Sequence, residues 1–188
     1  MRANTQRTAE RERLVNAAHR LAQLSQGDAL KLFRLLYMLD VQHFRSAGRS
    51  CTGETYYALA DGPAPGTLRP ALIMRDLDLD TAIDVLTATQ PRESWSFDPR
   101  YFNSRDLSIL NEIENHCGGV PACQLRVEDA NAWWRVYNTR GGVGAVIPYE
   151  MTLHSPGCGS VLEKSSEWLP FLGRLRIAES TRLDHRVD

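Results

Sequence analysis

Histidine and cysteine side chains that could bind a metal occur in two groups along the chain. His116, Cys117 and Cys123 form the first group, and His154 and Cys158 form the second. Zinc accepts such ligands in tetrahedral sets, commonly as pairs about two to five residues apart. The chain contains no CxxC pair, and Cys117 and Cys123 are further apart than in a usual zinc knuckle. Because cysteine is often buried for packing alone, we predict no metal and no other cofactor, and keep these residues as weak candidates.

A catalytic nucleophile would need a serine or cysteine beside a histidine base and an acidic residue. The chain has no GxSxG motif, and nothing selects a pair from its four cysteines and five histidines. Gly141, Gly142 and Gly144 fit neither GxxxxGK[ST] nor GxGxxG, which favours a tight loop over a phosphate site. We therefore predict that the protein is not an enzyme, and a zinc- or thiol-dependent hydrolase is kept as the alternative.

Asp40 and His43 are three residues apart in an otherwise apolar segment, and Tyr37 precedes Asp40 by one helical turn. A buried carboxylate is costly unless it is paired or hydrogen-bonded. Acid–base catalysis would need a second convergent polar group, which the sequence does not show. The favoured interpretation is a polar clamp from this helix to segment 52–57, with acid–base chemistry as the alternative.

Adjacent tryptophans at 133 and 134 mark a possible binding surface. Neighbouring residues on a helix point about 100° apart, so we expect one tryptophan in the core and the other near the surface. Tryptophan and tyrosine are enriched in binding hot spots, and arginines flank this pair. The predicted partner-binding residues are Trp134, Arg135, Tyr137 and Arg140.

Composition and charge limit the class of protein. The 188 residues suit one domain, and 43% apolar with 24% charged residues is typical of a globular fold. A net charge of −1 provides no overall attraction for nucleic acid or an anionic membrane. No apolar run reaches the roughly 18 residues of a membrane span, and the N-terminal segment is too charged for a signal peptide. We expect a cytoplasmic protein with reduced cysteines.

Apolar periodicity predicts the main helices. The pattern indicates an amphipathic helix over 10–24 after a polar, frayed start, and then a buried helix from Ala29 to about Ala47. Asp28 is its expected N-cap and Gly48 its expected C-terminal stop. A further helix over 105–116 would be capped by Asn103 or Ser104.

The remaining segments have weaker patterns. We predict a strand within 52–59, a rigid turn at 62–65, one or two helical turns over 71–74, a helix over 77–88 and a short strand at 95–97. Another helix would run from Pro121 to about 134, and a closing helix with a polar tail would occupy 154–188. The predicted fold class is therefore mainly α with a small β element, an α+β domain.

Residues 31–65 resemble the signature of the Panacea domain, the SocA-like antitoxin family once catalogued as a phage-associated domain of unknown function. The matching stretches are Lys31-Leu32-Phe33-Arg34-Leu35-Leu36-Tyr37 followed by Asp40, then Gly48-Arg49-Ser50-Cys51-Thr52-Gly53, Tyr56-Tyr57-Ala58 and Gly62-Pro63-Ala64-Pro65. The likeness continues through 102–107 and Ala132-Trp133. Ala64 replaces the family's usual valine, residues 118–121 form a longer link than usual, and 141–144 and 154–188 lie outside the match.

The resemblance implies a Panacea-like domain over 28–153, with an N-terminal helical extension over 1–27 and a C-terminal helix and tail over 154–188. Its implied scaffold residues are Lys31, Leu35, Tyr37, Asp40, Gly48, Thr52, Gly53, Tyr57, Gly62, Pro63 and Pro65. Residues 1–27 are too few for the DNA-binding module that some relatives carry.

Proteins of this family are bacterial and phage antitoxins, and most neutralise a protein toxin by direct contact. The resemblance thus implies a cognate protein toxin as partner. The net charge and the lack of a long apolar run are the reasons to expect neither a nucleic acid nor a membrane as partner. One alternative is an adaptor that delivers the toxin to an ATP-dependent protease. A DNA-binding autorepressor is a further rival.

Overall fold

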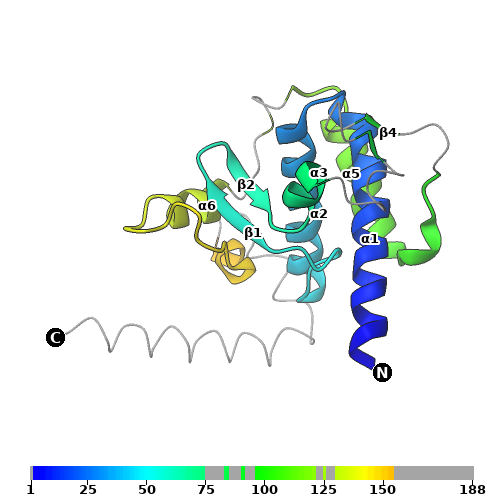
Figure 1. Cartoon of the computed structure of the whole chain (residues 1–188), viewed down its shortest axis with the longest axis horizontal. Helices are drawn as coiled ribbons and strands as arrows, with labels where there is room; N and C mark the ends of the chain where they lie inside the picture. Colours follow the sequence, from blue (N-terminus) through cyan, green and yellow to red (C-terminus); the bar gives the residue numbers. More distant parts are fainter. Residues whose placement is uncertain are drawn as a thin grey trace.

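The computed structural model of the chain describes residues 2–74, 83–84, 90–91, 96–121, 125 and 130–154. Most of them are helical, and the strands form small antiparallel pairs (Figure 1). The prediction of a mainly α fold with a small β element is confirmed. In chain order the elements are α1 (Arg2–Ser25), α2 (Ala29–Ala47), β1 (Tyr56–Leu59), β2 (Gly62–Pro65), α3 (Leu68–Met74), β3 (Ile83–Asp84), β4 (Gln90–Pro91), η1 (Pro99–Tyr101), α5 (Ser104–Cys117), α6 (Ala130–Tyr137) and η3 (Tyr149–His154).

Helix α2 lies at the centre of the core, as its apolar pattern predicts. The Asp28 side chain accepts a hydrogen bond from the Lys31 amide at 3.0 Å and so caps the helix start. At the other end Gly48 is left-handed, with φ of 73°, and its N–H donates to the Phe44 carbonyl. Helices α1 and α5 lie along one side of α2 and the β1–β2 hairpin lies on the other (Figure 1). The predicted bounds and both caps are confirmed.

Helix α1 begins at Arg2, so the prediction of a frayed start over 1–9 is wrong for residues 2–9. Arginine, alanine and glutamine make up five of those eight residues, and all three have high helix propensity. Further along, Leu14, Ala17, Ala18 and Leu21 are buried in the core. Small alanines on this face allow α1 to approach α2 closely.

The small sheet is built on β1. Strand β2 pairs antiparallel with it, from Tyr56 opposite Pro65 to Leu59 opposite Gly62, so the predicted rigid turn at 62–65 is in fact a strand. Proline lacks an N–H and is therefore compatible with an edge strand, which is the position β2 takes. Along the opposite side of β1, the Ala58 amide donates to the Ala145 carbonyl and the Ile147 amide donates to the Tyr56 carbonyl, each at 2.8 Å.

Several predicted bounds differ from the structure. Helix α3 begins at Leu68 rather than after Pro70, because a first helical turn accepts proline. The helix predicted over 77–88 is wrong at Ile83–Asp84, which pairs as β3 with β4. The strand predicted at 95–97 is absent at Ser96 and Phe97, and Trp95 lies outside the described residues.

Helix α5 follows its prediction within a residue at each end. Asn103 caps it, and its side chain accepts from the Arg105 and Asp106 amides while Asp106 accepts from the Asn103 amide, a complete capping box. Helix α6 begins at Ala130, and most of the predicted 121–134 helix before it lies outside the described residues, as does the predicted 154–188 helix and tail beyond His154. Within the described part of the chain, no helix is long and apolar enough to span a membrane.

Candidate functional site

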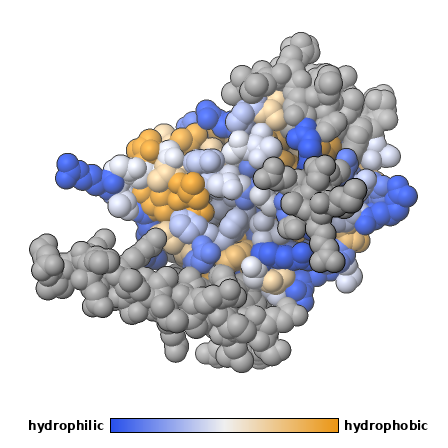
Figure 2. Space-filling view, turned by 60° about the horizontal axis from the view of Figure 1, so that its bottom comes forward, coloured by the Kyte–Doolittle hydropathy of each residue, from blue (hydrophilic) through white to orange (hydrophobic). Residues whose placement is uncertain are grey.

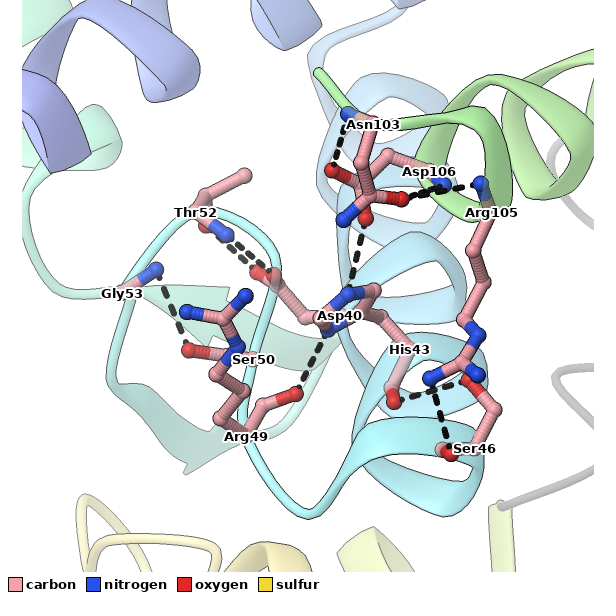
Figure 3. A network of polar contacts seen from close by, with 10 residues as sticks. All are labelled: Asp40, His43, Ser46, Arg49, Ser50, Thr52, Gly53, Asn103, Arg105 and Asp106. Atoms are coloured by element: carbon pink, nitrogen blue, oxygen red, sulfur yellow. Dashed lines mark hydrogen bonds and ion pairs between the residues drawn. The ribbon is translucent and has the colours of Figure 1, made fainter. Parts of the chain in front are cut away.

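Asp40 ties α2 to the bend that precedes β1. Its Oδ1 accepts from the Thr52 amide at 2.8 Å, and its Oδ2 accepts from the Thr52 hydroxyl at 2.6 Å and the Tyr56 hydroxyl at 2.8 Å. Figure 3 shows the two contacts between Asp40 and Thr52. The Tyr56 ring also meets the Tyr37 ring edge-on, with centroids 4.9 Å apart. These contacts have the geometry that the clamp interpretation predicts.

Burial sets the electrostatics of this clamp. Asp40 has 0% of its surface exposed, and this burial raises its pKa to about 6 despite the hydrogen bonds from Thr52 and Tyr56 that oppose the shift. The neighbouring Glu54 charge raises it further. Burial also raises the pKa of Tyr56 well above its ordinary value, with the Asp40 charge as the next cause. Because water and substrate do not reach Asp40 in this conformation, its contacts are structural.

His43 joins three segments through its two ring nitrogens. Nε2 lies 2.8 Å from Asp106 Oδ1 on α5, and Nδ1 lies 2.7 Å from the carbonyl of Arg49 in the bend (Figure 3). Both partners present oxygen acceptors to the ring, so His43 connects α2 to α5 and to the bend at the same time. Burial would raise the pKa of Asp106, but the hydrogen bonds from His43 and the Asn103 amide, with the nearby positive charges, hold it below its ordinary value.

Asp106 and Glu54 are the polar residues that the clamp interpretation of the sequence missed. Asp106 could have been noticed as the acidic residue three positions after the Asn103 cap, but nothing local connects it to His43. Glu54 is buried and accepts from the amides of Thr67 and Leu68 at the start of α3. Burial raises the pKa of Glu54, and these backbone donors oppose the shift. No sequence signal marks this long-range contact.

The implied scaffold residues are mostly buried or conformationally special. Lys31 is buried and its Nζ donates to the Gly118 carbonyl at 3.0 Å, which fixes the end of α5 against α2. Leu35 and Tyr37 are in the core, Gly53 and Gly62 have positive φ, and Pro63 and Pro65 are buried in β2. Tyr57 is the exception, because 37% of its surface is exposed.

The predicted partner-binding residues lie on α6 and the loop that follows it. Trp134 is 54% exposed, Arg135 and Arg140 are exposed, and Tyr137 is half-buried. Trp133 is half-buried and its Nε1 donates to the Leu59 carbonyl at 2.9 Å, which anchors α6 on β1. One tryptophan thus packs inward and the other faces solvent, as predicted. The three rings form one cluster, with the Trp133 and Tyr137 centroids 5.5 Å apart.

Exposed apolar side chains extend this region beyond α6. Tyr57 on β1 forms an isolated bridge with Val146, which is 49% exposed, and Val143 is 66% exposed. We call Tyr57, Trp134, Arg135, Arg140, Val143 and Val146 the α6 surface. Figure 2 shows hydrophobic patches at the left of the molecule, the side on which Figure 1 places α6 and its loop. Sequence reasoning missed Tyr57, Val143 and Val146, because strand alternation alone does not say which face is covered.

The weak metal candidates are only partly described. His116 is exposed and its Nδ1 lies 2.7 Å from the Glu112 carbonyl, whereas the free thiol of Cys117 is buried. Cys123, Cys158 and the side chain of His154 lie outside the described residues. In the portion that is described, no three His, Cys, Asp or Glu side chains form a group able to hold a metal.

Cys51 is the other free cysteine among the described residues. It is buried in the core, and burial together with the Asp40 and Asp106 charges raises its thiol pKa. A protonated, buried thiol is a poor nucleophile.

Comparisons with protein families, with curated proteins and with solved structures found no match to this chain. The resemblance of residues 31–65 to the Panacea signature therefore stays a prediction.

Proposed function

We propose that the protein is an antitoxin that neutralises a protein toxin by binding it directly. The observation that carries this proposal is the exposure of Trp134, at 54%, between the core-anchored Trp133 and the exposed Arg135. Tryptophan, tyrosine and arginine dominate the binding energy of protein interfaces. A large aromatic side chain held at the surface by a stacked cluster is ready to bind without an ordering cost.

The buried polar groups favour binding over catalysis. Asp40, Glu54 and Asp106 each hold two or more segments together through the hydrogen bonds described above, and all three are buried. An acid–base catalyst needs a carboxyl or imidazole that a substrate can reach. These groups instead give the hairpin and α5 fixed positions on α2, a suitable support for an interaction surface.

The resemblance of residues 31–65 to the Panacea signature supports the choice of an antitoxin among binding proteins. The segment that carries it includes α2, the bend and the β1–β2 hairpin, and β1 of this segment packs against α6. Net charge of −1 gives no general attraction for DNA and disfavours an autorepressor.

Co-expression with the small open reading frame next to the gene tests the proposal. We expect the neighbour alone to arrest growth, growth to recover when both are expressed, and the two proteins to purify as a stable complex. Recovery accompanied by loss of the toxin would instead indicate an adaptor for proteolysis. A harmless neighbour that does not co-purify would contradict the proposal.

A further inference from the structure

Among the described residues, segment 144–147 forms an outer edge of the sheet on which no further strand is paired. In an antiparallel pair, successive residues direct their N–H and C=O groups to opposite edges. The Ala145 carbonyl accepts from the Ala58 amide and the Ile147 amide donates to the Tyr56 carbonyl, so these two groups point to β1, while the Ala145 amide donates to the Gly142 carbonyl. Val146 therefore directs its N–H and C=O away from β1, and no hydrogen bond within the described residues uses them.

The other edge of the sheet is closed to a new strand. Strand β2 is buried along its whole length, against α2 and α3. Its two prolines, Pro63 and Pro65, have no N–H to donate. Proline at an edge is a common protection against strand addition, and the 144–147 edge lacks it within its four residues.

The surroundings of the available edge are apolar and exposed. Val146 is 49% exposed and pairs with Tyr57, so their side chains share one face. Val143 lies in the loop just before this edge. That loop is joined to α6 by the bond from the Thr139 amide to the Val136 carbonyl at 3.1 Å, and the Gly142 amide donates to the Thr139 carbonyl at 2.7 Å. The exposed edge and the exposed Trp134 are thus parts of one folded unit.

Within residues 130–149 the charged side chains have one sign, whereas acidic Asp129 and Glu150 flank this range. Between residues 130 and 149 the chain carries Arg135 and Arg140 and no aspartate or glutamate. Both arginines are exposed. A partner segment with carboxylates would complement these charges, whereas a basic segment would be repelled.

From this edge and its charge we infer that the partner protein contributes an extended, acidic segment that adds a strand beside residues 144–147. Main-chain hydrogen bonds to Val146 would supply affinity, and alternate side chains would contact Tyr57 and the two arginines. The inference rests on the proposed function, because the neutralised toxin is the partner it describes. It adds the mode of binding and the chemistry of the bound segment.

Two substitutions at Val146 separate strand addition from simple side-chain contact. Val146→Pro removes the amide donor, whereas Val146→Ala keeps it and removes most of the side chain. In the complex with the co-purified neighbour, we expect Val146→Pro to weaken binding at least tenfold more than Val146→Ala does. Equal losses would overturn strand addition while leaving the antitoxin function standing.

Amide exchange in the unsubstituted full chain gives a second readout, which holds even if Val146→Pro perturbs the loop. We expect exchange of the Val146 amide to slow at least tenfold in the complex. The exposed Gly119, two residues after the last residue of α5, serves as the control, and the exchange rate of its amide should not change. Unchanged exchange at Val146 would overturn the inference.

Charge is tested with a probe that does not require the toxin. Two synthetic heptapeptides, one alternating valine with glutamate and the other valine with lysine, are titrated against the full chain. We expect the glutamate peptide to bind at least tenfold more tightly, and the preference to disappear in Arg135→Glu/Arg140→Glu but not in Arg69→Glu, a matched exposed arginine on α3. Equal binding, or no binding of either peptide, would overturn the acidic segment. If the chain prefers the glutamate peptide but does not bind the product of the neighbouring open reading frame, the proposed antitoxin function is overturned. The inferred site for an acidic segment would still stand.

Discussion

At the residue scale, Asp40 and Asp106 are both buried carboxylates with opposite pH behaviour. Asp40 accepts only from neutral donors, so burial dominates and raises its pKa to about 6. Asp106 faces the ring of His43, and the pKa of its carboxyl is held below the ordinary value. The stability that Asp106 contributes is therefore present above the ordinary carboxyl range and is lost as the pH falls through its lowered folded-state pKa.

We expect Asp40 to make the free energy of unfolding fall as the pH rises from about 4 to about 6. Its pKa is 3.8 unfolded and about 6 folded, so the folded state holds the proton more tightly, and the stability linked to this proton is lost across that window. The size of the effect is up to about 3 kcal/mol. Urea unfolding of the wild type and Asp40→Asn at several pH values measures it, and parallel pH profiles would contradict the assignment.

The His43–Asp106 pair should contribute strongly to stability. His43→Ala leaves the buried Asp106 carboxyl without its partner on α2, and we expect a loss of about 3 to 5 kcal/mol. In the double variant His43→Ala/Asp106→Ala the loss should be smaller than the sum of the single losses, because neither charge is left alone. Denaturant unfolding of the three variants at pH 7 gives the coupling energy, and additive losses would show that the two side chains act independently.

At the scale of elements, local caps set where helices end and packed glycines set where loops turn. Asp106 serves in two ways, because it completes the capping box of α5 and binds His43 on α2. The loop after α6 depends on Gly142, which lies against the end of that helix. A Cβ on Gly142 would overlap the Val136 carbonyl oxygen and lie 2.9 Å from that of Thr139.

Gly142→Ala should therefore destabilise the loop by about 1 to 3 kcal/mol, because neither backbone carbonyl can move without disturbing α6. Gly119→Ala is the matched control, since a Cβ there meets nothing within 4 Å. Thermal unfolding compares the two variants. If they had the same midpoint, the close packing of the loop on α6 would be refuted.

At the scale of the whole molecule, the fold separates its supporting core from its exposed interaction surface. Helix α2 and the buried carboxylates fix the hairpin, and the hairpin in turn supports α6 through the bond from Trp133 to Leu59. Substitutions at the α6 surface should therefore change binding without changing stability.

Trp134→Ala tests this expectation most directly. We expect the unfolding free energy to stay within about 0.5 kcal/mol of the wild type and toxin binding to weaken by about 2 kcal/mol or more, because a half-exposed hot-spot side chain contributes mainly to the complex. Calorimetric titration with the co-purified toxin measures the loss. Leu30→Ala, at a residue 41% exposed at the start of α2, is the control. Normal affinity of Trp134→Ala would place the interface elsewhere.

Elements whose signals are local could be predicted from the sequence. Asp28, Gly48 and Asn103 act through hydrogen bonds within a few residues, and the dense apolar pattern of α2 predicts burial on most of its faces. Helix geometry alone predicts that one tryptophan of the 133–134 pair faces inward and the other outward, and the structure shows that Trp134 is the exposed one.

Features that join distant segments could not be predicted from local sequence and are seen only in the folded structure. The local pattern around Pro63 and Pro65 predicts a turn, but these residues pair with β1 and form a strand. Likewise, the contacts of His43 with Asp106 and of Glu54 with Thr67 join residues 63 and 13 positions apart. Contacts at such separations produce no periodic pattern in the sequence that could predict them. The edge at Val146 exists because residues 144–147 pair with β1. This pairing depends on packing contacts from the whole fold rather than on local strand propensity, so the sequence does not predict it.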